Sequence, residues 1–124
     1  MIVLDTSVLI DGLTGPRDSA GAIRQAINAG ERLVLPAMVF YEWFRGPRLP
    51  AEIAAQEALF PSSGALPFGP EEALQAATIY KSVRRPRGRE IDIAIAASAI
   101  LRNATLWTLN PRDFSDIPGL RLKT

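Results

Sequence analysis

Four carboxylates occupy positions where a simple surface acid is unusual. Asp5 follows the apolar run 1–4, Glu42 lies within "VFYEWF", Asp92 within "EIDIAIAA", and Asp113 within "NPRDF", after the apolar "TLWTL". A buried, unpaired carboxylate is energetically costly, so such a group is neutral, paired or bound to a cation. These acids are therefore candidate site residues.

Their chemistry follows from charge. Two like charges about 4 Å apart repel by roughly 4 kcal/mol at an effective dielectric constant near 20. Carboxylates brought together therefore need protonation or a cation among them. Oxygen ligands favour Mg²⁺ or Mn²⁺, which activates water and stabilises charge on a phosphate. This predicts phosphodiester hydrolysis, with Asp5 and Asp92 as the main metal ligands and Glu42 and Asp113 completing the set or orienting water.

Each acid also has a local interpretation, which taken singly is the better one. Asp5 can cap a turn, and Glu42 can lie on the exposed side of a helix. Asp92 can interact favourably with the dipole at the start of a helix, and Asp113 can form an Asx-turn. The remaining acids, except Glu90, fit helix starts, polar faces or turns: Asp11, Asp18, Glu31, Glu52, Glu57, Glu71, Glu72 and Asp116. The shared relation of the four candidates to strand ends favours a site.

The elements that must position these acids alternate between strands and helices. Hydrophobic patterns and turn signals predict strands at 1–4, 32–36, 65–68, 104–109 and 120–123. They predict helices at 6–13, 19–29, 37–46, 50–60, 69–83 and 90–103. Alternation of this kind predicts an α/β fold, a parallel sheet covered by helices on both faces, as one domain over 1–124. Sites in such folds lie beyond the carboxyl ends of the strands, so the four acids can meet at one rim.

Composition excludes several kinds of site. The 124 residues are 48% hydrophobic and 22% charged, with net charge +1, as in an ordinary globular protein. Cysteine and histidine are both absent, which excludes a Ser-His-Asp arrangement and disfavours zinc. The sequence shows neither a signal peptide nor a run long enough to span a bilayer, so we expect a cytoplasmic protein without a membrane segment.

Several motifs together resemble one known family. "LDTSVLI", the glutamate after the second strand, "DIAIAASAI" and "TLNPRDFSDIPGLRL" resemble the PIN-domain family, and within it the VapC toxins of prokaryotic VapBC toxin–antitoxin pairs. The resemblance runs from Met1 to about Lys123, and the last motif is the most specific. It implies an α/β/α sandwich with a parallel sheet and a Mg²⁺- or Mn²⁺-dependent endoribonuclease that acts as a toxin.

The resemblance also assigns residues and partners. Asp5, Glu42, Asp92 and Asp113 match the four acids of the family. Its supporting polar positions, which orient carboxylates or a metal-held water, match Asn110 and either Thr6 or Ser7. Such toxins are usually homodimers and are silenced by a VapB antitoxin that blocks the acidic pocket.

Two positions depart from many relatives. Glu90 stands near Asp92, where a neutral residue is common; it is expected to cap the helix or form a salt bridge, with a minor metal role left open. Leu109 replaces a basic or polar residue, which is expected to affect substrate contacts rather than the metal.

Basic residues gather just before Asp92: Lys81, Arg84, Arg85, Arg87 and Arg89. The four arginines are candidate RNA-phosphate contacts that offset the acidic site, or simply a solvated loop. Arg45 and Arg48 are candidates for contacts to RNA or to antitoxin acids.

Aromatic residues crowd one predicted helix. Phe40, Tyr41, Trp43 and Phe44 cannot all face one core, so some are expected at a homodimer or antitoxin interface, or partly exposed. Trp107, in a presumed central strand, is expected in the core.

Two other functions remain open. One is a phosphoryl-transfer domain with Asp5 as phosphate acceptor, although "LDTS" lacks the second aspartate that a phosphatase of that type carries. The other is a non-catalytic RNA-binding or interaction module.

Overall fold

The fold is built on a small parallel sheet. The structure is a computed structural model that describes residues 1–123. Four strands run in the order β2-β1-β3-β4 and all pairs are parallel. They are β1 (Ile2–Leu4), β2 (Leu33–Val34), β3 (Thr105–Trp107) and β4 (Arg121–Leu122). The predicted parallel sheet is confirmed.

Helices connect the strands and carry most of the chain. They are α1 (Thr6–Thr14), α2 (Ser19–Asn28), α3 (Ala37–Arg45), α4 (Pro50–Leu59), α5 (Pro70–Ser82) and α6 (Glu90–Leu101), with 3₁₀ turns η1 (Ser62–Gly64) and η2 (Pro111–Asp113). α5 shows how sequence sets a helix start, because Pro70 occupies its first position and the Glu72 side chain accepts the Gly69 backbone N–H at 2.9 Å.

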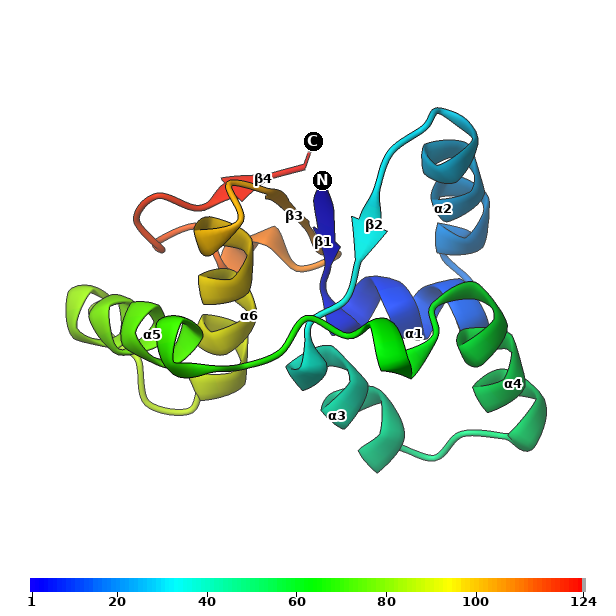
Figure 1. The fold of residues 1–124 in the computed structure, drawn as a ribbon, viewed down its shortest axis with the longest axis horizontal. Helices are drawn as coiled ribbons and strands as arrows, with labels where there is room; N and C mark the ends of the chain where they lie inside the picture. Colours follow the sequence, from blue (N-terminus) through cyan, green and yellow to red (C-terminus); the bar gives the residue numbers. More distant parts are fainter. Residues whose placement is uncertain (124) are drawn as a thin grey trace.

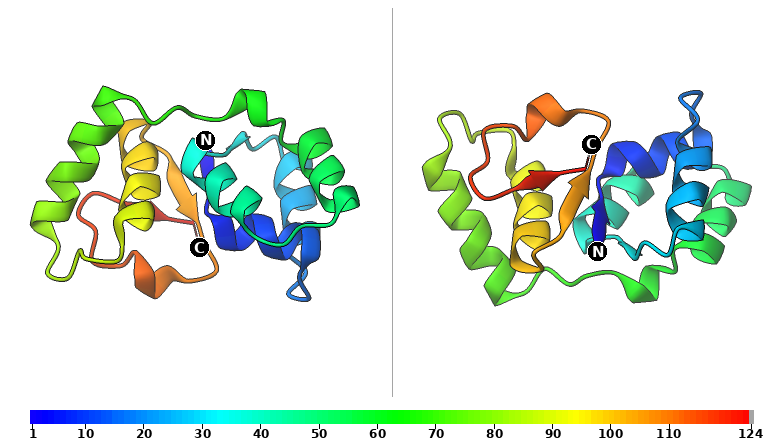
Figure 2. Two further views of the ribbon diagram at one scale, coloured as in Figure 1. Left: turned by 90° about the horizontal axis from the view of Figure 1, so that it is seen from below. Right: turned by 90° about the horizontal axis from the view of Figure 1, so that it is seen from above.

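The helices cover the sheet in layers (Figures 1 and 2). α6 contacts β1 and β3 on one side, and α5 packs outside α6. On the other side α1 contacts α2, α3 and α4, and α3 also contacts α6. The predicted three-layer α/β/α architecture is confirmed. α3 therefore bridges the two helical groups, with side chains near both α1 and α6.

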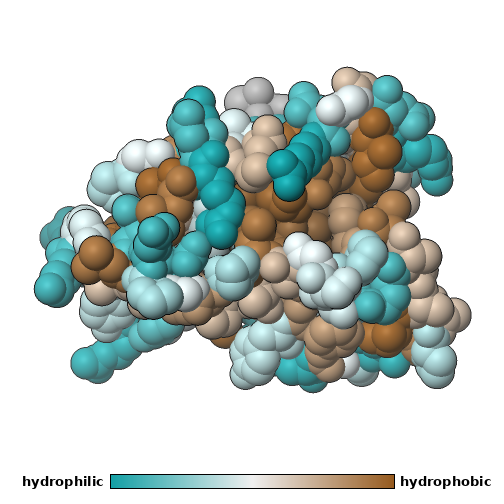
Figure 3. Space-filling model, viewed as in Figure 1, coloured by the Kyte–Doolittle hydropathy of each residue, from teal (hydrophilic) through white to brown (hydrophobic). Residues whose placement is uncertain are grey.

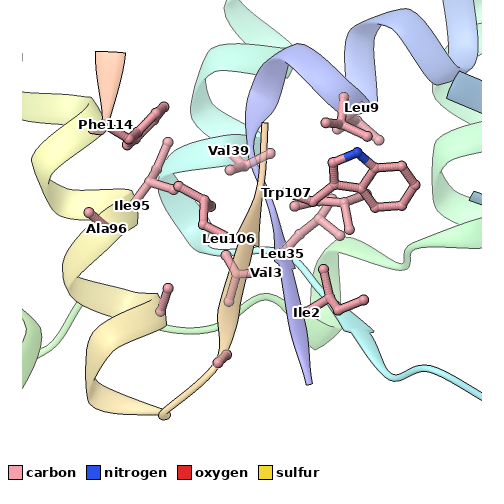
Figure 4. Packing of buried hydrophobic residues seen from close by; sticks show 14 of the residues in the cluster. Ile2, Val3, Leu9, Leu35, Val39, Ile95, Ala96, Leu106, Trp107 and Phe114 are labelled. Carbon is pink, nitrogen blue, oxygen red and sulfur yellow. The ribbon is translucent and has the colours of Figure 1, made fainter. Parts of the chain in front are cut away.

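The core lies between the sheet and both helical layers (Figure 4). Side chains alternate along β3, so that Leu106 points toward Ile95 of α6 while Trp107 points the other way, toward Leu9 of α1. Small residues on α6, Ala96 and Ala99, are completely buried and allow the helix to pack closely on the sheet. Trp107 is buried, as predicted.

The predicted strand at 65–68 is wrong. Only one isolated parallel bridge forms there, between Pro36 and Leu66. Leu66 donates to Leu35 and accepts from Ala37, but Pro36 and Pro67 have no N–H with which to extend a ladder. The segment therefore crosses the edge of the sheet without becoming a strand.

Asp11 also differs from its expected place on a polar surface. It is buried, and its carboxylate accepts the backbone N–H groups of Arg17 and Ser19, each at 3.0 Å. The Ser19 side chain first of all, together with these backbone hydrogen bonds and the charge of Arg17, holds the pKa of Asp11 below its usual range. Asp11 therefore fixes the connection between α1 and α2.

The surface shows both polar and apolar regions. Figure 3 shows hydrophobic side chains gathered over β2 and toward α2, with hydrophilic side chains on either side. Among residues 1–123, no helix is long and apolar enough to cross a membrane.

Candidate active site

The site begins where two neighbouring strands end. Leu4 of β1 lies opposite Trp107 of β3, and the Asp5 backbone N–H donates to the Trp107 carbonyl at 2.9 Å. The residues that follow the two strands, Asp5 and Thr108, are consequently side by side at the carboxyl edge of the sheet.

Asp5 is held by hydroxyl groups. It is 5% exposed, and its Oδ2 accepts hydrogen bonds from Ser7 Oγ and Thr108 Oγ1, both at 2.8 Å. The hydroxyls are themselves fixed, because Ser7 Oγ accepts the Leu109 N–H and Thr108 Oγ1 accepts the Asn110 N–H, each at 3.0 Å. Asp5 Oδ1 accepts no hydrogen bond from residues 1–123, so one oxygen of a fixed carboxylate is available for another ligand.

Glu42 reaches the same edge from α3. Its Oε1 accepts the Thr6 hydroxyl at 2.5 Å, and its Oε2 pairs with Arg45 at 3.2 Å. Of the two hydroxyls after Asp5, Thr6 thus orients Glu42 while Ser7 orients Asp5. Each of the two alternative supporting residues, Thr6 and Ser7, thus contacts an acid.

Asp92 is the acid whose environment is most unfavourable for charge. It lies half-buried in the first turn of α6 and accepts no hydrogen bond from a side chain or backbone group of residues 1–123. Burial first of all, and then the negative charges of Asp5, Glu42 and Asp113, raise its pKa to about 6 against the opposing attraction of Arg89. The other three acids therefore lie near enough to Asp92 to act on its charge.

Asp113 and Asn110 lie on the loop after β3. Both are exposed; Asn110 precedes η2 and Asp113 ends it. The Asp113 carbonyl accepts a hydrogen bond from Arg89 Nη2 at 3.0 Å. The Arg89 guanidinium also donates two hydrogen bonds to the Asp116 carboxylate, at 2.6 and 3.0 Å. Hydrogen bonding to Asp116 also raises the pKa of Arg89. Arg89 thereby fastens the loop to the start of α6, beside Asp92.

The carboxylates fit a hard divalent cation that keeps part of its water shell. No three acidic side chains among residues 1–123 are close enough together to hold one ion directly. Mg²⁺ commonly needs only one or two protein carboxylates, because waters complete its octahedron. Asp92 and the free oxygen of Asp5 would be such ligands, and neutralisation of their mutual repulsion would favour binding.

The basic candidates fall into two groups. Arg84, Arg85 and Arg87 are exposed and form no ion pair within residues 1–123. Arg89, by contrast, is engaged with Asp116. Glu90 is exposed in the first turn of α6, where it suits the helix dipole, and forms no ion pair with residues 1–123.

Sequence reasoning missed Thr108 and the clamp between Arg89 and Asp116. A signal for Thr108 was present, since a hydroxyl residue directly follows β3 as Asp5 follows β1. The clamp joins residues 27 positions apart, and no local pattern marks such a pair.

Two of the four acids, Glu42 and Asp92, border a hollow of about 440 Å³. Its lining residues are Glu42, Arg45, Gly88, Glu90, Ile91 and Asp92. This hollow admits a ligand to Glu42 and Asp92 from the side of α3 and α6.

Comparison with known proteins adds an independent line of support. The sequence matches the PIN domain family over residues 2–120. It is 33% identical over 125 residues to Ribonuclease VapC19 of Mycobacterium tuberculosis strain H37Rv, an alignment that covers 98% of each chain.

Solved structures are similar over nearly the whole chain. VapBC-1 from nontypeable Haemophilus influenzae is 28% identical with a TM-score of 0.69, covering 99% of this chain and 97% of that one. FitAcB from Neisseria gonorrhoeae is 18% identical with a TM-score of 0.76 and the same coverages, a likeness of fold alone. The strand-end acids, the architecture and the sequence agree, and the chain belongs to the PIN domain family.

Proposed function

We propose that this protein is a divalent-metal-dependent endoribonuclease that acts as the toxin of a type II toxin–antitoxin pair. The observation that carries the proposal is the environment of Asp92, a half-buried carboxylate that has no hydrogen-bond donor within residues 1–123 but has three other acids near it. A cation resolves this repulsion, and the curated relative that matches the full chain is named a ribonuclease.

The acids take different parts. Asp5 and Asp92 hold Mg²⁺ or Mn²⁺, which when bound supplies positive charge for the phosphate and lowers the pKa of a water. Ser7 and Thr108 keep the Asp5 carboxylate in one orientation, as ligand-orienting groups do at metal sites.

Glu42 and Asp113 act from the two sides of that pair. Thr6 fixes Glu42, so its carboxylate can accept a proton from an attacking water or hold that water in place. Asp113 is exposed on its loop and can accept hydrogen bonds from water or the leaving group; Asn110, on the same loop, adds an amide donor.

RNA needs positive charge nearby, because the acids repel phosphates. Arg84, Arg85 and Arg87 lie exposed just before α6 and provide it. Arg89 contributes indirectly, through the loop that it holds.

Partners follow from the relatives and from exposed aromatic groups. Several similar structures are VapBC complexes, one of them bound to promoter DNA. We therefore expect a VapB-type antitoxin, and a homodimer in the cytoplasm. On α3, Phe40 and Trp43 are buried whereas Tyr41 and Phe44 are 53% and 47% exposed, which leaves two aromatic rings for an interface.

The test compares RNA cleavage by wild type, Asp5→Asn and Asp92→Asn, mapped at nucleotide resolution with Mg²⁺ or Mn²⁺. Glu31→Gln, at an exposed position before β2, is the matched control. Cleavage should fall at least about a hundredfold in both aspartate variants, should persist in the control, and should stop with EDTA.

The same experiment distinguishes the alternatives. A phosphoryl-transfer domain would form a phosphate ester on Asp5 with a phosphodonor and would leave RNA intact. A binding module would arrest growth equally as wild type and as Asp5→Asn. Either result, with no cuts in RNA, refutes the ribonuclease.

A further inference from the structure

A second hollow lies between α1, the loop that follows it and the loop that follows β3. It measures about 330 Å³, which is within the size range of small-ligand sites. Its lining includes Ser7, Ile10, Pro16, Arg17, Leu109 and Asn110. Ser7 belongs both to this hollow and to the Asp5 hydrogen-bond network, so the hollow adjoins the candidate metal site directly.

The hollow has a rigid wall. The buried Asp11 carboxylate fixes the loop through the N–H groups of Arg17 and Ser19. Gly15 packs directly against the Asp11 carboxylate, since a Cβ at position 15 would lie 2.2 Å from Asp11 Oδ1. The loop that carries Pro16 and Arg17 is thus held in place by an acid that the catalytic cluster does not use.

The lining matches a nucleoside. Ile10, Pro16 and Leu109 provide apolar surface for the faces of a base, while the Asn110 amide offers both a donor and an acceptor to its edge. Arg17 is exposed, and its guanidinium forms no ion pair within residues 1–123, so it is available for a phosphate.

We infer that this hollow binds the nucleotide next to the scissile bond of an RNA strand, with Leu109 and Asn110 setting its base preference and Arg17 holding its phosphate. The inference rests on the proposed ribonuclease function and adds the route of the strand. RNA runs from Arg84, Arg85 and Arg87 through the hollow at Asp92, across Asp5, and into this second hollow.

The test uses Arg17→Gln and Leu109→Ala, with Arg24→Gln on the exposed side of α2 as control. Three quantities are measured: cut-site sequences in a random RNA pool, the dissociation constant of a 2′-O-methyl oligonucleotide that cannot be cleaved, and the Mn²⁺ dissociation constant. Arg17→Gln should weaken oligonucleotide binding about fivefold to tenfold, whereas Leu109→Ala should change the base preference at one position beside the cut about tenfold. Mn²⁺ binding and the control should not change.

Other outcomes overturn the inference in distinguishable ways. If wild type cuts RNA and both variants keep its cut sites and oligonucleotide affinity, the subsite is wrong and the ribonuclease stands. Loss of Mn²⁺ binding together with RNA binding would mean that these residues only support the metal site. If wild type neither binds nor cuts RNA, both proposals fail.

Discussion

At the scale of single residues, Asp92 lowers the stability of the fold that holds it. The pKa of Asp92 rises from 3.8 to about 6 in the folded protein, so the folded state keeps a proton that the unfolded chain releases between these values. The cost of ionisation is therefore absent below about pH 4, grows up to about pH 6 and is complete above it. A site built for a cation has this property, because the protein alone does not compensate the charge.

Asp92→Asn should consequently be more stable than wild type at pH 8 by on the order of 1–2 kcal/mol, after allowance for solvent screening, and equal to it near pH 4. Urea unfolding at both pH values, with EDTA present, measures the difference. Asp18→Asn, at an exposed position, is the control. A variant no more stable than wild type at pH 8 would contradict this reading of Asp92.

Thr108 offers a second test at this scale, because its hydroxyl both donates to Asp5 and accepts the Asn110 N–H. Thr108→Val removes both bonds while keeping the shape. Mn²⁺ affinity and RNA cleavage should fall about 10- to 100-fold, as for other groups that orient metal ligands. Thr78→Val on α5 removes an exposed hydroxyl bonded to the Leu74 carbonyl and should change neither. Unchanged Mn²⁺ binding in Thr108→Val would show that the hydroxyl does not support the metal ligand.

At the scale of elements, the Arg89–Asp116 ion pair connects α6 to the loop that carries Asp113. Its 2.6 Å contact is partly exposed, so its own contribution to stability is at most about 1 kcal/mol. Its larger effect is on position, because the same guanidinium holds the Asp113 carbonyl.

A double-mutant cycle with Arg89→Gln and Asp116→Asn tests that effect. Each single variant should lose about tenfold in cleavage rate, and the double variant should lose little more, since both changes break one connection. The free energy of unfolding should fall by less than about 1 kcal/mol in each variant. Losses that multiply in the double variant would show that the residues act separately.

Another link fixes α3, the helix that carries Glu42. Gln56 of α4 is fully buried; its Oε1 accepts the Trp43 indole N–H at 3.2 Å, and its amide donates to the Phe60 carbonyl at 2.9 Å. The Gln56 amide also donates to Glu57 Oε2 at 2.6 Å. Gln56→Met keeps the volume but leaves the Trp43 indole and the Phe60 carbonyl unsatisfied, so unfolding should be easier by about 1–3 kcal/mol. Gln25→Met, on the exposed side of α2, should have almost no effect in the same urea titration. Equal stability of the two variants would mean that water satisfies the partners of Gln56.

The elements also show what a sequence can predict here. An apolar run ending in Asp5 located β1, a second apolar run located β3, and helix starts such as Pro70 located α5, so the parallel sheet followed from local patterns. The segment 65–68 was misassigned because its apolar residues pack beside Pro36 without a ladder. Asp11 was misassigned because its partners are backbone N–H groups, which no side-chain pattern records.

At the scale of the whole molecule, a cation that binds only the folded state must stabilise it. A Mg²⁺ or Mn²⁺ concentration about ten times the dissociation constant adds roughly 1.4 kcal/mol to the free energy of unfolding. In a chain of 124 residues this raises Tm by a few degrees. Differential scanning calorimetry with each cation should show this rise, EDTA should reverse it, and Asp5→Asn should abolish it. The same rise in Asp5→Asn would place the cation elsewhere.

The positions of the two tryptophans have a practical consequence. Trp43 directly follows Glu42, and Trp107 directly precedes Thr108, while Arg48 and Lys123 lie over the respective indole rings at 4.4 and 4.5 Å. Intrinsic fluorescence therefore originates at two places in the candidate active site, one beside Glu42 and one beside Thr108. Each Trp→Phe variant would leave one fluorescent tryptophan, so unlabelled protein can report which of the two places responds first when a ligand binds.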